Sequence, residues 1–411
     1  MQLLDNGHIQ IPVFGEHDAA TLEQIATCAR GERVVGAALC ADGHKGYALP
    51  IGGVVAYEGA VSPNGVGFDI ACGLKGTRTD LRADDIRAHI ETIMDDIARE
   101  VNFGMGGRSN AHADHPLFDD PRWADPLLSG LKSLAREQLG TVGSGNHFVD
   151  LLEDEEGWLW VLVHFGSRGF GHKVASGFLC LAAGLCFGDR LPGHLDAGEP
   201  VVLPLDTPLG ESYFAAMGLA GRYAYAGRDA VTAQVLALLG AAEVDSVHNH
   251  HNYAFRETHG GREVIVVRKG STPAFPGQRG VIGGSMGDVS VVVEGVASDA
   301  SALAFHSTVH GAGRVMSRTK AAGKRKWLPG PDGRKRPRVV APGAVSPEMM
   351  RAWLEREGVV LRGGGLDESP HVYRRLPEVL AAHVGTIRVV HTLKPLGVAM
   401  AGEDVFDPYK D

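Results

Sequence analysis

Five segments of this 411-residue chain, which lie directly after predicted strands or inside glycine-rich turns, carry side chains that could bind a metal or act as a nucleophile. The first, NGVGFDIACGL, places Asp69 and Cys72 three residues apart. A carboxylate and a thiolate so close can share one metal ion, which deprotonates the thiol. In isolation, however, a buried structural cysteine beside a capping aspartate explains the segment better. The second, TVGSGNHFVD, adds Asn146, His147 and Asp150 after small residues.

Histidines stand out in the third and fourth segments. A predicted strand runs into HFGSRGFGH, which places His164 at the strand end and Arg168 in the following turn. A single histidine at a strand end is more often a hydrogen-bonded structural residue than a ligand. The fourth segment, HNHHNY, crowds His248, His250 and His251 within four residues, so a metal site and a structural cluster are about equally good explanations. The spacing matches neither CxxC nor HExxH, and a metal here would need ligands from distant segments.

The fifth segment, FHSTVHGAGRVMSRTK, has His310 directly before small residues at 311–313, and a basic run follows. Small residues beside an imidazole let a nucleotide or phosphate approach closely, and Arg314 and Arg318 can neutralise its charge. A turn with a solvated basic face explains this segment alone at least equally well. Together, however, one aspartate, one cysteine and several histidines in glycine-rich turns predict a two-metal phosphoryl-transfer site, with softer ligands than a magnesium carboxylate cage.

The elements that must hold these segments follow from apolar periodicity. Four isoleucines recur at the helical period and predict an amphipathic helix over 86–97. Further helices are predicted over 213–239, 347–357 and 376–383. Runs of β-branched and apolar residues predict the strands 158–163, 264–267, 289–293 and 387–390. Since helices and strands do not alternate regularly, the order predicts an α+β fold rather than a doubly wound sheet.

Composition and charge limit the class of protein. With 44% hydrophobic and 22% charged residues, the composition is that of a globular protein and excludes a disordered chain. The formal net charge of -9 argues against a general binder of polyanions. The basic residues are nevertheless concentrated, because residues 314–338 contain ten Lys and Arg and one acid. The stretch at about 318–338 is predicted to be an exposed basic loop.

The cysteines and the absence of long apolar runs bear on location. Five cysteines, an odd number scattered along the chain, predict reduced thiols and a cytoplasmic protein. No run approaches the ~18 apolar residues of a membrane helix, and the first residues do not resemble a signal peptide, so no membrane partner is expected. No repeat or Ser/Gly linker marks a boundary, which predicts one domain over residues 1–411.

Nine motifs, in order along the chain, resemble those of the RtcB family of GTP-dependent RNA ligases. They are DGHKGYALPIGGVVA, GVGFDIACG, GSGNHF, HFGSRGFG, HHNY, RKGSTPAFPG, GGSMG, HGAGRVMSRTK and LKPLGV. The matches run from about residue 40 to the end of the chain. The resemblance implies an α+β fold particular to the family, in which a central cleft holds two Mn²⁺ ions.

The resemblance also implies which residues bind the two manganese ions. Asp69, Cys72 and His147 match ligands of one ion. Cys72, His164 and His251 match ligands of the other ion, so Cys72 bridges the two. Among the crowded histidines, His251 is the match because it directly precedes the asparagine of the HHNY motif.

The nucleophile and the nucleotide contacts are implied in the same way. His310 matches the histidine that takes GMP covalently from GTP, and Asp42 matches the acid that orients it. Arg168 is expected to stabilise charge during the transfer. Tyr373 matches the aromatic residue that stacks on guanine, whereas Met400 stands where family members commonly have a guanine-contacting lysine. The other matches to nucleotide-contacting positions are Asn146, Asp150, Asn252, Gly283, Ser285, Met286, Ser290, Gly311, Ala312 and Gly313.

The activity implied is ligation of an RNA 3′-phosphate or 2′,3′-cyclic phosphate to a 5′-hydroxyl end, through a covalent histidine–GMP intermediate. The expected partners are these RNA ends, GTP and an optional activating protein. Two alternatives retain part of the site: a metal-dependent RNA end-processing phosphodiesterase, and a non-ligating RNA-end-binding homologue. His310 favours the ligase over the phosphodiesterase, since hydrolysis needs no covalent nucleotide. The intact ligand set disfavours the non-catalytic homologue.

Overall fold

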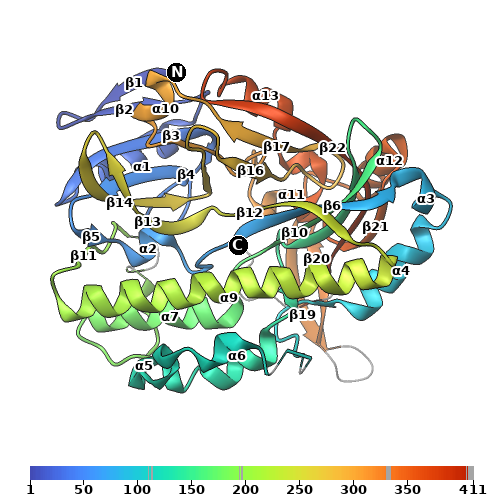
Figure 1. The fold of residues 1–411 in the computed structure, drawn as a ribbon, viewed down its shortest axis with the longest axis horizontal. Coiled ribbons are helices and arrows are strands. Elements are labelled where there is room, and N and C mark those ends of the chain that lie inside the picture. The colour runs from blue at the N-terminus through green and yellow to red at the C-terminus, as the bar shows by residue number, and fades with distance from the viewer. Residues whose placement is uncertain are drawn as a thin grey trace.

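Two large sheets dominate the fold, one at the left and one at the right of Figure 1. The computed structural model describes residues 1–109, 111, 112, 114–193, 195, 198–329, 335–403 and 405. The six-stranded sheet consists, in spatial order, of β1 (Gln2–Asp5), β2 (Gln10–Val13), β3 (Val34–His44), β4 (Ile51–Tyr57), β14 (Arg262–Lys269) and β13 (Asn252–His259).

The eight-stranded sheet carries the ends at which the candidate ligands lie. It consists, in order, of β12 (Glu243–His250), β6 (Gly73–Arg82), β10 (Trp158–Phe165), β9 (Phe148–Glu153), β22 (Ile387–Gly402), β17 (Ser290–Gly295) and β16 (Arg279–Ile282), with β21 (Val360–Gly364) beside β22. Four further strand pairs are β5 (Ala60–Val61) with β11 (Leu203–Pro204), β7 (Asn102–Phe103) with β8 (Thr141–Gly143), β15 (Ser271–Pro273) with β18 (Ser307–Val309), and β19 (Lys324–Pro329) with β20 (Lys335–Ala341).

Helices cover the sheets, and two of them, α7 and α9, lie together along the lower side of the molecule in Figure 1. The helices are α1 (Ala19–Cys28), α2 (Pro63–Val66), α3 (Ala83–Arg87), α4 (Ile90–Glu100), α5 (Pro126–Ser129), α6 (Lys132–Gln138), α7 (Arg168–Ala182), α9 (Pro208–Leu239), α10 (Asp299–Leu303), α11 (Arg318–Ala322), α12 (Pro347–Glu357) and α13 (Leu376–Ala381). No helix in the described ranges is both long and apolar enough to cross a membrane.

The longest helix, α9, has a strong signal at each end. Thr207 accepts a hydrogen bond from the Gly210 amide and caps the first turn, and Pro208 occupies the first helical position. Gly240 ends the helix in the left-handed conformation, with φ of 64°. Between these caps α9 packs against α7 and against β6 and β10, and so supports the eight-stranded sheet from one side.

Four neighbouring strands of the eight-stranded sheet bring their ends to one edge. β12, β6, β10 and β9 are consecutive and antiparallel. Gly73 at the start of β6 pairs with His250 at the end of β12 and with Phe165 at the end of β10. Phe148 at the start of β9 pairs with His164. Residues at these strand ends therefore lie side by side although they are far apart in the sequence.

The predicted α+β class is confirmed, but some predicted elements are wrong in extent. The helix predicted over 86–97 is two helices, α3 and α4, because His89 leaves the helical conformation, with φ of -118° and ψ of 9°. The strand predicted over 387–390 is only the beginning of β22. β22 continues to Gly402 because it pairs first with β17 and then with β9, contacts that the local sequence does not encode.

The segment at about 318–338 also differs from the predicted loop. It contains α11 and then an antiparallel pairing of β19 with β20, from Lys324 opposite Ala341 to Pro329 opposite Lys335. Residues 330–334 lie outside the described part of the chain. The composition of these two basic runs indicates a loop. The runs form strands instead because the backbone N–H and C=O groups of each run bond those of the other.

Candidate functional site

Five side chains with metal-binding groups converge at the shared edge of β12, β6, β10 and β9. Cys72 directly precedes β6, His147 directly precedes β9, and His164 lies near the end of β10. His251 directly follows β12, and Asp69 lies in the turn before β6. They form two groups whose ligand atoms lie within 4.8 Å of one another: Asp69, Cys72 and His147, and Cys72, His164 and His251. Cys72 is the member that both groups share.

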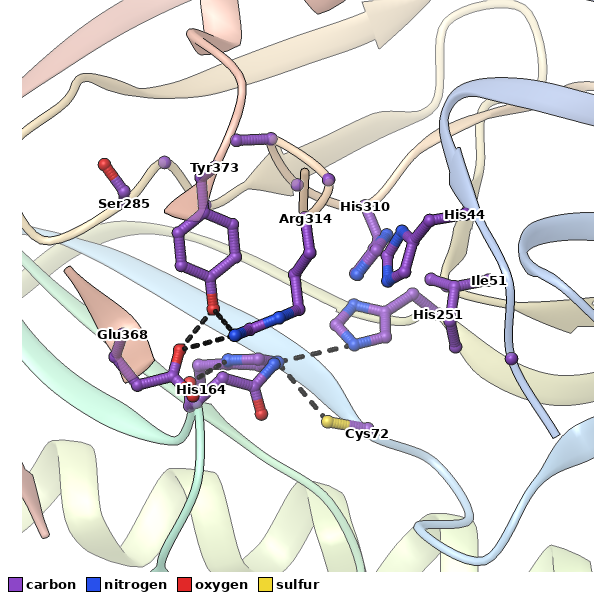
Figure 2. Close-up of a pocket in the computed structure, with 18 of the residues that line it drawn as sticks. His44, Ile51, Cys72, His164, His251, Ser285, His310, Arg314, Glu368 and Tyr373 are labelled. Carbon is purple, nitrogen blue, oxygen red and sulfur yellow. Dashed lines mark hydrogen bonds and ion pairs between the residues drawn. The ribbon is translucent and has the colours of Figure 1, made fainter. Parts of the chain in front are cut away.

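The ligand atoms face one another closely. Cys72 Sγ lies 3.7 Å from His147 Nε2 and 3.3 Å from His164 Nε2. His164 Nε2 in turn lies 3.4 Å from His251 Nε2, and Figure 2 shows these two rings and the thiol turned toward a common point. His147 Nε2 is 3.0 Å from Asp69 Oδ2. Sulfur, nitrogen and oxygen donors thus surround one small volume.

The second ring nitrogen of two of these histidines is held by the backbone. His147 Nδ1 is 3.0 Å from the Val142 carbonyl oxygen, and His164 Nδ1 is 3.0 Å from the Asn146 carbonyl oxygen. Because a carbonyl can only accept, Nδ1 of each ring carries a proton. Nε2 of each ring lies toward the shared thiol, which is the orientation a metal ligand needs.

Burial sets the charge of the cluster. It raises the pKa of the Cys72 thiol, and the nearby Asp69 carboxylate raises it further. Burial also lowers the pKa of His164 and of His251, so both imidazoles are neutral. Burial alone would raise the pKa of Asp69, but the hydrogen bond and charge of His147 outweigh this effect and lower it. A divalent cation would compensate the acid and convert the thiol to a thiolate.

The donor set fits a divalent transition metal. One thiol, three imidazoles and a carboxylate are softer than the oxygen ligands that Mg²⁺ prefers, and they suit a divalent transition metal. A close backbone approach keeps the carboxylate in place: a Cβ on Gly166 would lie 2.2 Å from Asp69 Oδ1. Only glycine at this position lets the β10–α7 turn pass the acid.

A buried arginine supports the cluster from behind. Arg228, on α9, is fully buried and donates to the carbonyl oxygens of Ala71 at 3.0 Å and Phe165 at 2.5 Å. These two residues directly precede Cys72 and directly follow His164, and Ala71 has a left-handed φ of 60°. The same guanidinium contacts the rings of His248 and His250, at 2.8 Å and 3.0 Å, so these two histidines of the crowded motif face away from the ligand cluster.

His310 lies directly after β18, beside the ligand cluster. Its Nδ1 is 2.6 Å from Asp42 Oδ2, and the same oxygen accepts from the backbone amides of His310 and Gly311 at 3.0 Å and 3.3 Å. Asp42 is fully buried; burial would raise its pKa, but the charge and hydrogen bond of His310 outweigh this and lower it. Since Asp42 binds Nδ1, Nε2 is the ring nitrogen of His310 that could act as a nucleophile. The ring centroids of His310 and His251 are 4.8 Å apart.

A cavity of about 580 Å³ runs past His310 and the ligand cluster. Among the residues expected to contact a nucleotide, those in its wall are Asn146, Asp150, Asn252, Gly283, Ser285, Met286, Gly311, Ala312, Gly313 and Tyr373. Met400 also lines it. Asp150 is buried, which raises its pKa well above the usual range, and its Oδ1 has no hydrogen-bond partner in the described ranges. This wall therefore offers amide, hydroxyl and carboxyl groups beside an aromatic ring.

Two arginines and an acid surround the tyrosine of the cavity. Arg314 donates to the Tyr373 hydroxyl at 3.0 Å, and its guanidinium carbon lies 5.1 Å from the ring centroid. The Tyr373 hydroxyl also contacts Glu368, as Figure 2 shows, and Arg318 pairs with Glu368 and with Asp367. Two guanidinium groups therefore lie at the cavity wall, and the carboxylates of Glu368 and Asp367 balance their charge.

Four expected residues lie outside the cavity wall: Asp42 and His147, described above, and Arg168 and Ser290. Arg168 has a left-handed φ of 56°, and its guanidinium contacts Thr141 Oγ1 at 3.3 Å and the Gly104 carbonyl oxygen at 3.4 Å. From there its charge helps to lower the pKa of Asp69. Ser290 Oγ accepts from the Gly284 amide at 2.9 Å and so supports the wall from behind.

Sequence reasoning missed several residues of the cavity, among them His44, Lys45, Tyr47, Lys269 and Glu368. The first three follow Asp42 in DGHKGYALPIGG, and Lys269 belongs to RKGSTPAFPG. Both stretches are motifs of the family resemblance, but the resemblance implies no role for these residues. The signal that could have found them is the proximity of polar and aromatic residues to glycines, which often marks a ligand-binding turn.

Comparison with known proteins identifies relatives along most of the chain. The family model of the tRNA-splicing ligase RtcB matches residues 24–124 and 124–327. A tRNA-splicing ligase RtcB from Thermococcus kodakarensis is 32% identical, over 87% of this chain and 86% of the relative. An RNA-splicing ligase RtcB from Escherichia coli K12 is 31% identical, over 87% and 88%. A tRNA-splicing ligase RtcB from Pyrobaculum aerophilum is 32% identical, over 87% and 86%.

Proposed function

The chain belongs to the family of the tRNA-splicing ligase RtcB, and on this premise we propose that it is a GTP-dependent RNA ligase. It joins RNA ends that carry a 3′-phosphate or a 2′,3′-cyclic phosphate to ends that carry a 5′-hydroxyl. One observation carries the proposal: a histidine fixed through Nδ1 by a buried aspartate stands beside a cluster of metal-binding side chains. Such a nucleophile favours the ligase over a phosphodiesterase, because hydrolysis needs no covalent nucleotide.

Two Mn²⁺ ions are the proposed metals. Asp69, Cys72 and His147 would hold one ion, and Cys72, His164 and His251 the other, in accord with the two overlapping donor groups. When bound, the ions would polarise phosphoryl oxygens and neutralise the charge that develops on them. The thiol shared by the two groups supports the assignment of Cys72 as the bridging ligand.

The first chemical step is self-guanylylation of His310. Nε2 attacks the α-phosphorus of GTP, an N–P bond forms, and pyrophosphate leaves with the electron pair of the broken P–O bond. Asp42 retains the proton on Nδ1 and stabilises the positive charge of the modified ring. Arg314 lines the cavity and would balance phosphate charge, and Arg168 contributes through Asp69 rather than by contact. Tyr373 would stack on the guanine.

Two transfers complete the ligation. Where the RNA ends in a 2′,3′-cyclic phosphate, water opens it: the water oxygen bonds to phosphorus, the bond from phosphorus to the 2′-oxygen breaks, and the 2′-oxygen takes up a proton. An oxygen of the 3′-phosphate then attacks the GMP phosphorus and displaces His310. The 5′-hydroxyl oxygen then attacks the 3′-phosphorus, GMP leaves with the electron pair of the bond that breaks, and the hydroxyl proton passes to solvent. The partners are therefore RNA ends and GTP, with an activating protein as an optional addition.

Two further proposals concern the whole chain. Residues 1–411 act as one domain, because the cavity draws its wall from both large sheets. All five cysteines are free, which supports a reducing, cytoplasmic location.

The test is covalent labelling. Purified protein incubated with Mn²⁺ and GTP labelled at the α-phosphate should acquire a label that is acid-labile and alkali-stable, as expected of a histidine phosphoramidate. His310→Ala should bind nucleotide and metal but take up no label and seal no RNA. Opening of a cyclic phosphate without any labelling would instead favour the phosphodiesterase, and normal labelling of His310→Ala would show that another residue is the nucleophile.

A further inference from the structure

The strand that carries Asp42 is interrupted at this residue. Leu39 of β3 has partners on β2 and on β4, and the next residue of β3 with a partner is His44. Residues 40–43, the β3 bulge, therefore have no ladder partner in the described part of the chain. Since buried backbone groups need hydrogen bonds, the bulge depends on partners from outside the sheet.

Two residues from the C-terminal part of the chain supply the partners of Ala41, which directly precedes Asp42. The Ala41 amide donates to Nε2 of His383, and these atoms are 3.1 Å apart. Arg374 Nη1 donates to the Ala41 carbonyl oxygen at 2.7 Å. The backbone amide of Arg374 also donates to the Gly313 carbonyl oxygen at 3.0 Å, in the glycine-rich turn after β18. Arg374 thus connects the β3 bulge with that turn.

We infer that His383 and Arg374 are positioning residues of the proposed guanylylation step. They hold the amide and the carbonyl group of Ala41, and through this main chain they fix the place of the Asp42 carboxylate. Asp42 in turn orients His310 through Nδ1. The inference rests on the proposed ligase function, because the step that it concerns is the attack of His310 on GTP.

The main chain must position this carboxylate because its own hydrogen bonds lead to the groups that it orients. Asp42 Oδ2 accepts from His310 Nδ1 and from the backbone amides of His310 and Gly311. Asp42 Oδ1 is buried and has no hydrogen-bond partner within the described ranges. The place of the carboxylate in the protein therefore depends on the β3 bulge, and the bulge depends on the two bonds to Ala41.

The surroundings of His383 make its ring a neutral acceptor. A backbone N–H can only donate, so Nε2 accepts from Ala41, and Nδ1 donates to Thr386 Oγ1 at 3.2 Å. The ring is fully buried and stacks on Phe14, with centroids 4.4 Å apart. Burial lowers the pKa of His383 to about 4, so the ring is uncharged at neutral pH. Nε2 thus remains available to the Ala41 amide.

A positioning role and a purely structural role predict different kinetics. If the two bonds only stabilise the fold, their loss lowers stability and leaves the folded protein fully active. If they position Asp42, their loss slows the attack of His310. Nucleotide binding is then retained, because neither His383 nor Arg374 belongs to the described wall of the cavity. A displacement of ~1 Å can cost ~10²-fold in rate.

The first test follows labelling of His310 by GTP in single turnovers with Mn²⁺. His383→Leu removes the acceptor and should lower the rate constant at saturating GTP about 10- to 100-fold, with the half-saturating GTP concentration unchanged. His383→Gln, whose amide oxygen can accept near the position of Nε2, should restore most of the rate. Val379→Ala, which removes buried methyl groups from α13, should be less stable than the parent but label at its rate.

The carbonyl side of Ala41 gives a second variant, which serves even if His383→Leu does not fold. Arg374 is partly exposed, so its replacement is compatible with folding. Arg374→Met should lower the same rate constant, and Arg374→Lys, which keeps a donor, should recover part of it. The control is Arg388→Met, which removes an exposed ion pair with Glu294 and should leave the rate unchanged.

An NMR signal measured without GTP provides the decisive comparison. The proton between His310 Nδ1 and Asp42 Oδ2, atoms 2.6 Å apart, should give a strongly deshielded resonance that is absent from His310→Ala. It should weaken or move upfield in His383→Leu and persist in His383→Gln and Val379→Ala. A parental resonance and rate in His383→Leu, or a loss of rate no greater than that of Val379→Ala, would overturn the inference. If the parent takes no label from GTP yet the resonance depends on His383, the ligase proposal fails and the positioning of Asp42 stands.

Discussion

A single sulfur atom links the two candidate metal sites at the scale of the residue. Cys72 Sγ is the ligand atom that belongs to both donor groups, whereas His147 belongs to one and His251 to the other. Its burial and its neighbour Asp69 raise the pKa of the thiol, so that a cation is needed to make it a thiolate. The loss of this one side chain should therefore affect both sites.

We predict that Cys72→Ala loses both manganese ions, because each site is reduced to two protein ligands. His147→Ala should lose mainly one ion. Elemental analysis of the purified variants after loading with Mn²⁺ measures the metal content directly. Two ions retained in Cys72→Ala would remove the bridging role.

Met400 is the second residue of interest, because it bears on the choice between guanine and adenine. It lies on β22 opposite Phe148, is buried, and lines the cavity. The family resemblance implies a lysine at this position. A lysine can donate to the guanine carbonyl oxygen and is poorly suited to the adenine amino group. One charged hydrogen bond is worth about 1.5–3 kcal/mol, or roughly 10- to 100-fold in selectivity. Lys410, which could substitute for it, lies outside the described residues.

We therefore predict a weak preference for GTP over ATP in the parent and a stronger one in Met400→Lys. Competition of unlabelled ATP against labelled GTP in the self-labelling reaction measures this preference. Strong exclusion of ATP by the parent, with no change in Met400→Lys, would show that base selection lies elsewhere in the cavity.

At the scale of the element, α9 fixes the strand ends through Arg228. Its guanidinium bonds the carbonyl oxygens on either side of the ligand cluster, next to Cys72 and next to His164. Arg228→Met would leave these buried carbonyl oxygens unsatisfied, at a cost of about 1–3 kcal/mol for each group. We predict lower stability and at least about 10-fold weaker Mn²⁺ binding, measured by denaturant unfolding and by calorimetric titration.

The matched control for Arg228 lies on the same helix. Arg222 is partly exposed and pairs with Asp120 at 2.6 Å, so Arg222→Met should change stability by no more than about 1 kcal/mol. Metal binding in this variant should equal that of the parent. Equal metal affinity in Arg228→Met and Arg222→Met would contradict the supporting role of Arg228.

The hairpin of β19 and β20 is the second element with a testable role. Lys324 and Lys326 are exposed on β19 and belong to the basic run of the chain. Charge reversal to glutamate at both positions should weaken RNA binding and reduce the slope of log affinity against log salt by about 0.7 for each RNA phosphate that the hairpin no longer neutralises. Labelling of His310 by GTP should be retained. An unchanged salt slope would leave the hairpin without a role in RNA binding.

At the scale of the whole molecule, metal binding should stabilise the fold. The ligands come from turns before β6 and β9, from β10 and from the junction after β12, so a bound ion would tie together strand ends that are far apart in sequence. A ligand at 100 times its Kd adds about 2.7 kcal/mol to the free energy of unfolding.

Chelation of the metal should accordingly lower the unfolding temperature of the parent by several degrees, and Mn²⁺ should restore it. Differential scanning calorimetry measures the change. Cys72→Ala should show little response to either treatment. A parent whose unfolding temperature ignores both chelator and Mn²⁺ would indicate that metal binding is not coupled to folding.

Much of this protein is determined by local sequence. The long apolar stretch at 213–239 lies within α9, and the helix at 347–357 has the predicted bounds, because periodicity and caps act over a few residues. The chemical types of the candidate ligands are also explicit in the sequence: one thiol, three imidazoles and a carboxylate within glycine-rich turns. These features indicate what chemistry is available.

The tertiary structure alone decides where that chemistry is assembled. The order β12, β6, β10, β9 brings Cys72, His164 and His251 together, whereas Arg168, equally prominent in the sequence, contacts Thr141 outside the cavity wall. The loop that joins β3 to β4 depends in the same way on Gln24 and Lys269, whose side chains bind its carbonyl oxygens from distant positions in the sequence. Hydrogen-bond register and burial join residues that are far apart along the chain, and no local pattern encodes those contacts.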